Sequence, residues 1–212
     1  MQTDDLIAAL SGDLAPAPKG WVTRTTLLGA AGGTLAAALL WLVPMGLRAD
    51  LAEAAQASPF WMKFFYTLAL ALLGLWLLAR AGRPGARLAP PALALLAPVA
   101  VLAVMAAMAL DAAGADTHKL LMGHSALFCP FAIVAVSLPV LAGALWSLKR
   151  LAPTRLTEAG AAAGLFAGSA GAFVYAFYCT ESAAPFVALW YSAGILLSGV
   201  IGAAIGRIAL RW

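Results

Sequence analysis

Residues 126–148 read ALFCPFAIVAVSLPVLAGALWSL, a run that contains no charged side chain. Its length lies within the roughly 17 to 25 apolar residues that cross a bilayer as an α-helix. The run holds Cys129, one of only two cysteines in the chain, close to its start. It therefore predicts a membrane helix with a thiol at one end.

The composition of the whole chain agrees with this prediction. Hydrophobic residues make up 64% of the sequence and charged residues 10%, with a mean hydropathy of +0.94. An average soluble domain has about 25% charged residues. The net charge of +4 comes from bases in short loops between apolar runs, so a direct nucleic-acid interface is not expected.

Five more apolar segments accompany the first. They cover residues 25–47, 64–79, 91–110, 159–178 and 186–206, and residues 59–63 extend the second of these. Short loops leave no room for a soluble domain and make sequential neighbours antiparallel. The sequence predicts an all-α membrane protein with six transmembrane helices in residues 25–212, preceded by a short cytoplasmic amphipathic tail in residues 1–24.

The distribution of basic residues predicts the orientation. If the tail is cytoplasmic, only Arg48, Lys63 and Lys119 lie outside. The cytoplasmic side then holds Lys19, Arg24, Arg80, Arg83, Arg87, Lys149, Arg150, Arg155, Arg207 and Arg211. This positive-inside bias indicates a multi-pass membrane protein with both termini in the cytoplasm. In a bacterial inner membrane the opposite side would face the periplasm.

The segments show no ionisable residue deep inside them. Proton relays, ion paths and coupled transport generally need such groups within the membrane. The absence of such groups therefore disfavours a small-molecule or metal exporter.

The N-terminal tail carries a helix-start pattern. Thr3 is a candidate N-cap, and Asp4 and Asp5 fall in the first turn, where the helix dipole favours acids. The apolar side chains of this helix lie on one face. They are Leu6, Ile7, Leu10 and Leu14. So short a helix is marginal alone, so we expect it to dock on a partner. The alternative is a disordered tail or a helix lying on the bilayer, although its acids disfavour anionic lipid.

Small residues recur four positions apart, which places them on one helix face for close packing. They are Gly29 and Gly33, then Gly160, Gly164 and Gly168, and finally Gly202 and Gly206.

The second cysteine, Cys179, follows the segment after that of Cys129, so an antiparallel hairpin returns both thiols to the outward side. Three interpretations are open: a structural disulfide, a redox or metal sensor, or two unrelated buried thiols. His118 and His124 precede Cys129 on the same side, which gives Cys129, Cys179, His118 and His124 as candidate ligands of a soft metal. The alternative for these histidines is an interfacial position without a ligand.

Several short motifs resemble the NrsF-type negative regulators of extracytoplasmic-function sigma factors. They are TDDLI at 3–7, CP at 129–130, CTES at 179–182 running on to PF at 185–186 and WY at 190–191, and the closing LRW at 210–212. The resemblance covers essentially the whole chain.

This resemblance implies a membrane anti-sigma factor that is not an enzyme and needs no cofactor. The tail from Thr3 to Leu14 would hold an extracytoplasmic-function sigma factor, and Cys129 and Cys179 would sense heavy metals or oxidants. The main competing class is a membrane thiol-disulfide oxidoreductase, but the sequence lacks a Cys-x-x-Cys pair and a second thiol relay.

Overall fold

The computed structural model describes residues 3–12 and 18–211, and within these ranges every regular element is helical. The long helices are α2 (Trp21–Met45), α4 (Ser58–Ala81), α6 (Leu96–Ala113), α8 (Cys129–Leu151), α9 (Leu156–Tyr175) and α11 (Ser192–Ala209). The short elements are α1 (Thr3–Gly12), α3 (Leu51–Ala54), α5 (Ala89–Ala94), the 3-10 turn η1 (Gly114–Asp116), α7 (Thr117–Met122), α10 (Ala184–Phe186) and the π-helical η2 (Val187–Tyr191).

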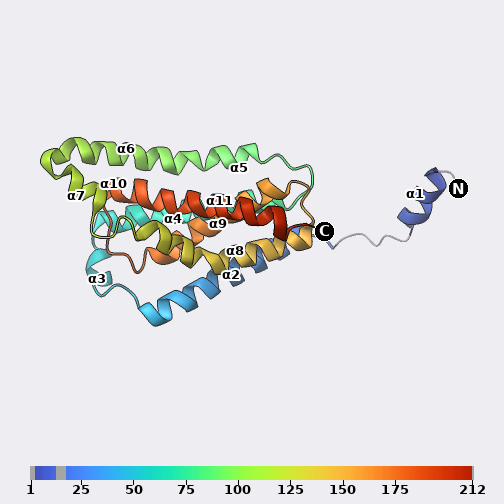
Figure 1. Cartoon of the computed structure of the whole chain (residues 1–212), viewed down its shortest axis with the longest axis horizontal. Helices are drawn as coiled ribbons and strands as arrows, with labels where there is room; N and C mark the ends of the chain where they lie inside the picture. The colour runs from blue at the N-terminus through green and yellow to red at the C-terminus, as the bar shows by residue number, and fades with distance from the viewer. Residues whose placement is uncertain (1–2, 13–17, 212) are drawn as a thin grey trace.

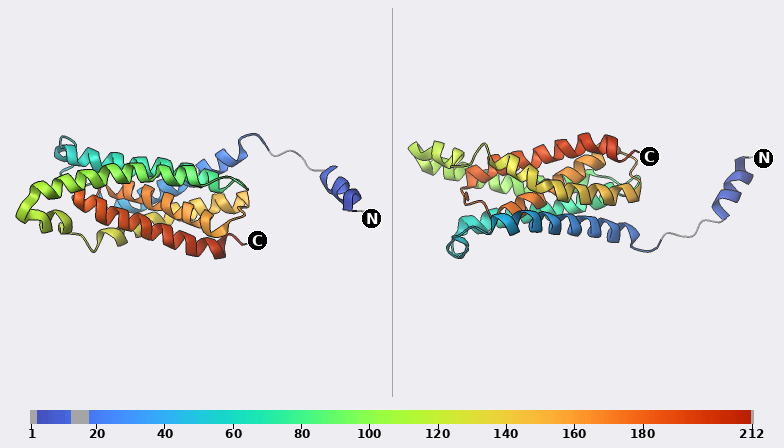
Figure 2. Two further views of the ribbon diagram at one scale, coloured as in Figure 1. Left: turned by 90° about the horizontal axis from the view of Figure 1, so that it is seen from above. Right: turned by 60° about the horizontal axis from the view of Figure 1, so that its bottom comes forward.

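The long helices form an antiparallel bundle (Figure 1). The start of α2 and the end of α11 lie at one end of it, as two further views confirm (Figure 2). The short elements α3 and α7 lie at the opposite end. Helix α1 is present in the tail, with Thr3 as its first residue, and Figure 1 shows it apart from the bundle, beyond the end where the C-terminus lies.

The predicted number of spans is wrong. In the described residues five helical segments are long and apolar enough to cross a membrane, rather than six. Helix α9 is not apolar enough, because it consists largely of Gly, Ala and Ser and has Thr157 and Glu158 in its first turn. It packs against α4, α8 and α11, and 14 of its 20 residues are buried. Protein surrounds this helix, so it runs between the two ends of the bundle without the bulk or the apolarity of a lipid-facing helix. Because α9 makes this pass, the start of α2 and the end of α11 lie at the same end.

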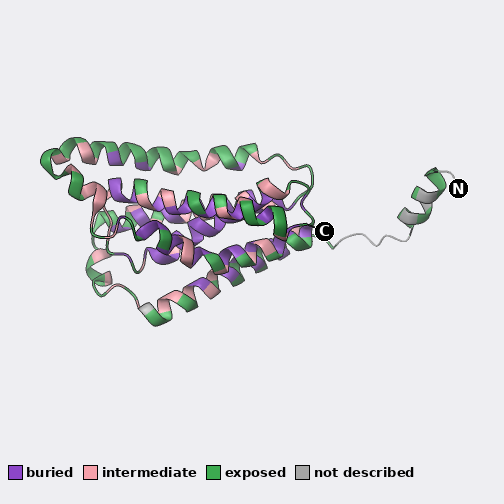
Figure 3. Ribbon diagram, in the orientation of Figure 1, coloured by how far each residue is buried: buried purple, intermediate pink, exposed green. Residues whose placement is uncertain are grey.

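The other helices turn apolar side chains outward. Leu35 of α2, Val104 of α6 and Ile208 of α11 are 61%, 61% and 77% exposed. Figure 3 shows α5 and α6 as the most exposed part of the bundle and α9 among the most buried. Exposed apolar surface on this scale suits a lipid environment.

Glycines set the closest helix contacts, as their spacing predicted. A Cβ added at Gly164 would meet the Ser198 carbonyl oxygen and lie 2.8 Å from the Gly199 Cα, so α9 and α11 touch through their backbones. Likewise, a Cβ at Gly33 would lie 2.9 Å from the Pro139 carbonyl oxygen, where α2 crosses α8. These contacts need residues without side chains.

Candidate thiol site at one end of the bundle

Two helix ends bring the cysteines together. Cys129 is the first residue of α8, and Cys179 follows the end of α9, with its backbone N–H donating to the Tyr175 carbonyl at 2.9 Å. Because α8 and α9 are antiparallel neighbours, both residues lie at the bundle end opposite the start of α2. The thiols are free, buried and hydrogen-bonded to each other. The two thiols therefore lie at the same end of the bundle, as the hairpin predicted, and no disulfide links them.

A buried lysine lies beside this pair. Lys63 of α4 has no exposed surface, and its Nζ donates to the carbonyl oxygens of Cys179 at 2.7 Å and Glu181 at 2.8 Å. Lys63 was expected on the outward side of the membrane, but its burial was not predicted. The burial arises because the loop after α9 folds over the start of α4 and encloses the ammonium.

Tyr191 closes the site from the other side. It lies in the π-helical η2, and its ring centroid is 5.8 Å from the Lys63 Nζ. The residue is fully buried next to the Cys179 thiol, yet its hydroxyl makes no well-formed hydrogen bond to any described residue. Single turns of π-helix frequently occur at functional sites.

Arg48 adds a second cation at the same loop. Its backbone N–H donates to the Phe177 carbonyl at 3.1 Å, and its Nη1 lies 3.4 Å from the Cys179 carbonyl oxygen. The guanidinium also pairs with Asp50 at 2.6 Å. Arg48 thus ties the end of α2 to the loop that carries Cys179.

The surroundings of Cys179 favour its thiolate. The hydrogen bond from the Cys129 thiol is the main cause that lowers the pKa of Cys179 to about 6, and the Lys63 charge also lowers it. Burial opposes both effects. A cysteine thiol has an ordinary pKa of about 8.5.

The histidines do not join the thiols. His118 is exposed on α7, and the side chain of His124 is 92% exposed. The His124 backbone N–H donates to Glu181 Oε1 at 2.8 Å, and its Nδ1 lies 3.3 Å from the same oxygen. Across the part of the chain that the structure describes, no three His, Cys, Asp or Glu residues are grouped to hold a metal ion. The candidate four-ligand metal site is not assembled.

The predicted docking residues lie on α1, far from the thiols in sequence. Thr3, Asp4, Asp5 and Ile7 are exposed there. The side chains of Leu6 and Leu10, and all of Leu14, lie outside the described residues.

Comparison with known proteins identifies the chain. A family model described as "NrsF: Negative regulator of sigma F" matches residues 10–212. The chain belongs to the NrsF family. It is 36% identical over 215 residues to the "Probable anti-sigma-F factor NrsF" of Azospira oryzae, and 39% identical over 218 residues to the "Anti-sigma-F factor NrsF" of Caulobacter vibrioides. Both alignments cover all of each chain, and no solved structure matches.

Membership of the NrsF family confirms the resemblance drawn from the short motifs. The NrsF family is a family of regulatory proteins. Sequence patterns did not predict Lys63 or the hydroxyl of Tyr191 as neighbours of the two thiols. The available sign was a lysine inside the aromatic run 60–65, FWMKFF, at the start of a membrane helix.

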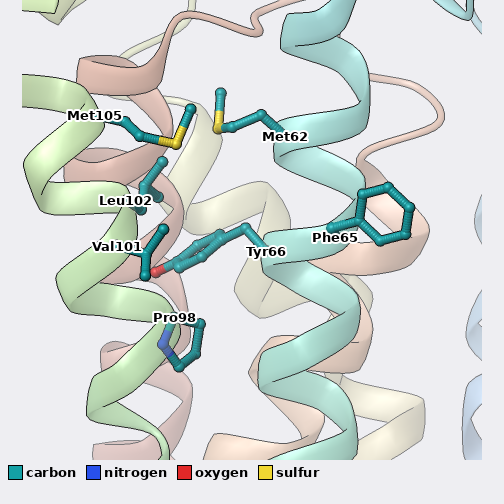
Figure 4. Close-up of a pocket in the computed structure, with 7 residues that line it drawn as sticks. All are labelled: Met62, Phe65, Tyr66, Pro98, Val101, Leu102 and Met105. Carbon is teal, nitrogen blue, oxygen red and sulfur yellow. The ribbon is translucent and has the colours of Figure 1, made fainter.

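A cavity elsewhere in this NrsF chain carries no such chemistry. It has a volume of about 290 Å³ between α4 and α6 and is lined by Met62, Phe65, Tyr66, Pro98, Val101, Leu102 and Met105 (Figure 4). Its one titratable group, Tyr66, bonds the Ser192 hydroxyl at 2.6 Å. The thiols lie outside this lining, and the cysteine pair is the stronger candidate for a functional site.

Proposed function

We propose that this protein is an inner-membrane anti-sigma factor that holds an extracytoplasmic-function sigma factor through its N-terminal helix and releases it when Cys129 and Cys179 are oxidised. One observation carries the proposal. Two cysteines that are distant in sequence meet at the bundle end opposite the start of α2, the helix that follows the tail. Helices therefore connect the thiols at one end of the bundle to the docking segment that precedes its other end.

The orientation rests on where the basic residues lie in the fold. The last turns of α4, α8 and α11, which lie near the start of α2, carry bases, and one more base follows α4. These are Arg80, Lys149, Arg150 and Arg207, with Arg83 after α4. The thiol end has few bases. The positive-inside rule places the tail in the cytoplasm and the thiols in the periplasm.

This orientation predicts the behaviour of fusion proteins. A fluorescent protein that matures only in the cytoplasm should fluoresce when fused after Trp212, and alkaline phosphatase fused there should be inactive. Alkaline phosphatase inserted between Ala115 and Asp116 should be active. Active phosphatase at the C-terminus would contradict the orientation.

The docking proposal rests on the exposed helix α1. By sequence pattern, Leu6, Ile7 and Leu10 of α1 share a face with Leu14, which follows the helix, and a sigma factor surface would cover that face. Replacing Leu10 by Asp would place a charge in this contact, which costs several kcal/mol when unpaired. We therefore expect at least a tenfold loss of sigma factor co-purified from membranes.

Ala9→Asp is the matched control, because it adds the same charge one position away, at an exposed residue off the apolar face. It should keep nearly all of the sigma factor. Equal loss in both variants would show that the apolar face does not dock.

The burial of the pair indicates what kind of signal reaches it. Cys129 is 0% exposed and Cys179 is 5% exposed, so a protein dithiol has no surface to attack. A small oxidant such as hydrogen peroxide needs far less room. The balance is two thiols plus one peroxide giving one disulfide and two waters. This limit on access favours a sensor over a thiol-disulfide oxidoreductase.

Thiophilic cations are the parallel signal to test. The buried ammonium of Lys63 repels a divalent cation at the pair, while it attracts a thiolate. We expect hydrogen peroxide to release more sigma factor than cadmium(II) at equal occupancy of the thiols.

The route to the tail runs through packed helices. A disulfide would draw together the start of α8 and the loop after α9. Helix α8 packs along α2 at Gly29 and Gly33, and α2 leads directly back to the tail. Oxidation acts only through its different affinity for two packings, and a nearly complete switch needs about 5 kcal/mol of difference.

The experiment is a pull-down from membranes before and after peroxide treatment. The intact protein should bring down a sigma factor and lose it on oxidation, whereas the Cys129→Ser, Cys179→Ser variant should keep it. Absence of a sigma factor from every untreated sample would overturn the proposal.

A further inference from the structure

The two thiols of the pair have different surroundings. Cys129 is fixed in the first turn of α8, whereas Cys179 lies in the loop that α4, η2 and the end of α2 enclose. The titratable or charged groups that face Cys179 are Lys63, Arg48, Cys129, Tyr175, Tyr191 and Glu181. Two cations therefore lie on the side of Cys179.

Lys63 is the more deeply placed of these cations. An ammonium has three N–H donors, and two of them are occupied by the carbonyls of Cys179 and Glu181. These bonds fix the ammonium against the backbone of the cysteine itself. Water does not screen this fully buried charge, so its influence on the neighbouring thiolate is strong.

The hydroxyl of Tyr191 is the second independent observation. It is fully buried beside the Cys179 thiol and lacks a well-formed hydrogen bond among the described residues. A buried hydroxyl is costly without a partner, and the group beside this one is the Cys179 sulfur. A thiolate at Cys179 would accept a hydrogen bond from it.

Building on the proposed function, we infer that Cys179 is the thiol that attacks a peroxide, Cys129 is the resolving thiol, and Lys63 is the positioning residue that stabilises the attacking thiolate. The Cys179 sulfur takes one peroxide oxygen and becomes a sulfenic acid, while the other oxygen leaves and, with a proton, becomes water. The Cys129 thiol then attacks the sulfur of this sulfenic acid. A disulfide forms, and the sulfenic oxygen leaves with the thiol proton as water. Two thiols are oxidised and one peroxide is reduced.

The start of α8 supplies the competing assignment. Helix N-termini stabilise thiolates, and Cys129 is the first residue of its helix. In this structure, however, both cations bond to the backbone of Cys179. Lys63 Nζ lies 2.7 Å and Arg48 Nη1 3.4 Å from its carbonyl oxygen, so the geometry points to Cys179.

The test uses full-length protein in lipid nanodiscs with one cysteine at a time. Cys129→Ser keeps an O–H donor beside Cys179, and Cys179→Ser leaves Cys129 alone. Hydrogen peroxide is added and the sulfenic acid is trapped with dimedone and measured by mass spectrometry. At pH 7 we expect Cys129→Ser to react at least ten times faster than Cys179→Ser.

Lys63 is tested in the Cys129→Ser background. Lys63→Gln keeps N–H donors for the two carbonyls but loses the charge, and Lys63→Arg keeps a charge. We expect the Gln variant to react about tenfold more slowly at pH 7 and to approach its parent at pH 9, where the thiolate forms without help. The Arg variant should recover much of the rate. Thermal unfolding confirms that each variant is folded.

The inference is overturned by equal or faster reaction of Cys179→Ser, by a Lys63→Gln rate equal to that of its parent at pH 7, or by the absence of sulfenic acid at either thiol. A loss in Lys63→Gln that is the same at every pH would assign the lysine to loop packing alone, which also contradicts it. The assay contains no sigma factor, so its failure is separate from any failure of docking or release.

Discussion

Replacing Gly164 by valine should separate α9 from α11 and leave little folded protein in the membrane. A Cβ at this position would meet the Ser198 carbonyl oxygen and lie 2.8 Å from the Gly199 Cα. Both are backbone atoms, so no side chain can rotate away. Overpacking usually costs about 1 to 3 kcal/mol, and a contact between two backbones belongs at or above the upper end. The measurement is thermal unfolding of purified protein in detergent.

Gly32→Val is the matched control. Gly32 is helical and nothing lies within 4 Å of its added Cβ, whereas its neighbour Gly33 is packed against Pro139 and Val140. The Gly32 variant should unfold at nearly the parent temperature. If Gly164→Val were as stable as Gly32→Val, the close contact of α9 and α11 would not exist.

Replacing both cysteines by serine should abolish the response to peroxide in cells. Without Sγ atoms no disulfide can form, so transcription from promoters of the bound sigma factor should stay at its resting level. In the parent we expect a rise of tenfold or more, because release converts nearly all of the sigma factor to its active form. A reporter gene under such a promoter gives the measurement.

One control and one contradicting outcome belong to this prediction. The double variant must still lower transcription relative to a strain without the protein, which shows that it folds and docks. An unchanged rise with peroxide in the double variant would place the sensor outside the pair. Serine is the appropriate replacement because it keeps the size and a hydrogen-bond donor at both buried positions.

Much of the fold could be predicted from local patterns. Five of the six predicted apolar runs coincide with the five segments that can cross a membrane. The glycines at positions 160, 164 and 168 predicted the face on which α9 meets α11. The count of six failed at α9, because length and absence of deep charge do not distinguish a lipid-facing helix from one enclosed by protein. That difference lies in the size of the side chains.

The site was predictable only in part. An antiparallel hairpin was enough to bring Cys129 and Cys179 to one end. The partners Lys63 and Tyr191 come from α4 and η2, so they meet the thiols only through the three-dimensional path of the loop after α9. His124 shows the reverse case, since it is near Cys129 in sequence yet bonds Glu181 instead. Spacing along the chain predicts neither the approach of Lys63 and Tyr191 to the thiols nor the bond from His124 to Glu181.

The most direct test of the central claim follows the thiols and the sigma factor in one sample. The purified complex in nanodiscs is titrated with hydrogen peroxide, and each sample is divided for mass spectrometry of the Cys129–Cys179 disulfide and for measurement of released sigma factor. We predict that both quantities rise with the same midpoint and that dithiothreitol reverses both. Complete formation of the disulfide with the sigma factor still bound would contradict the account.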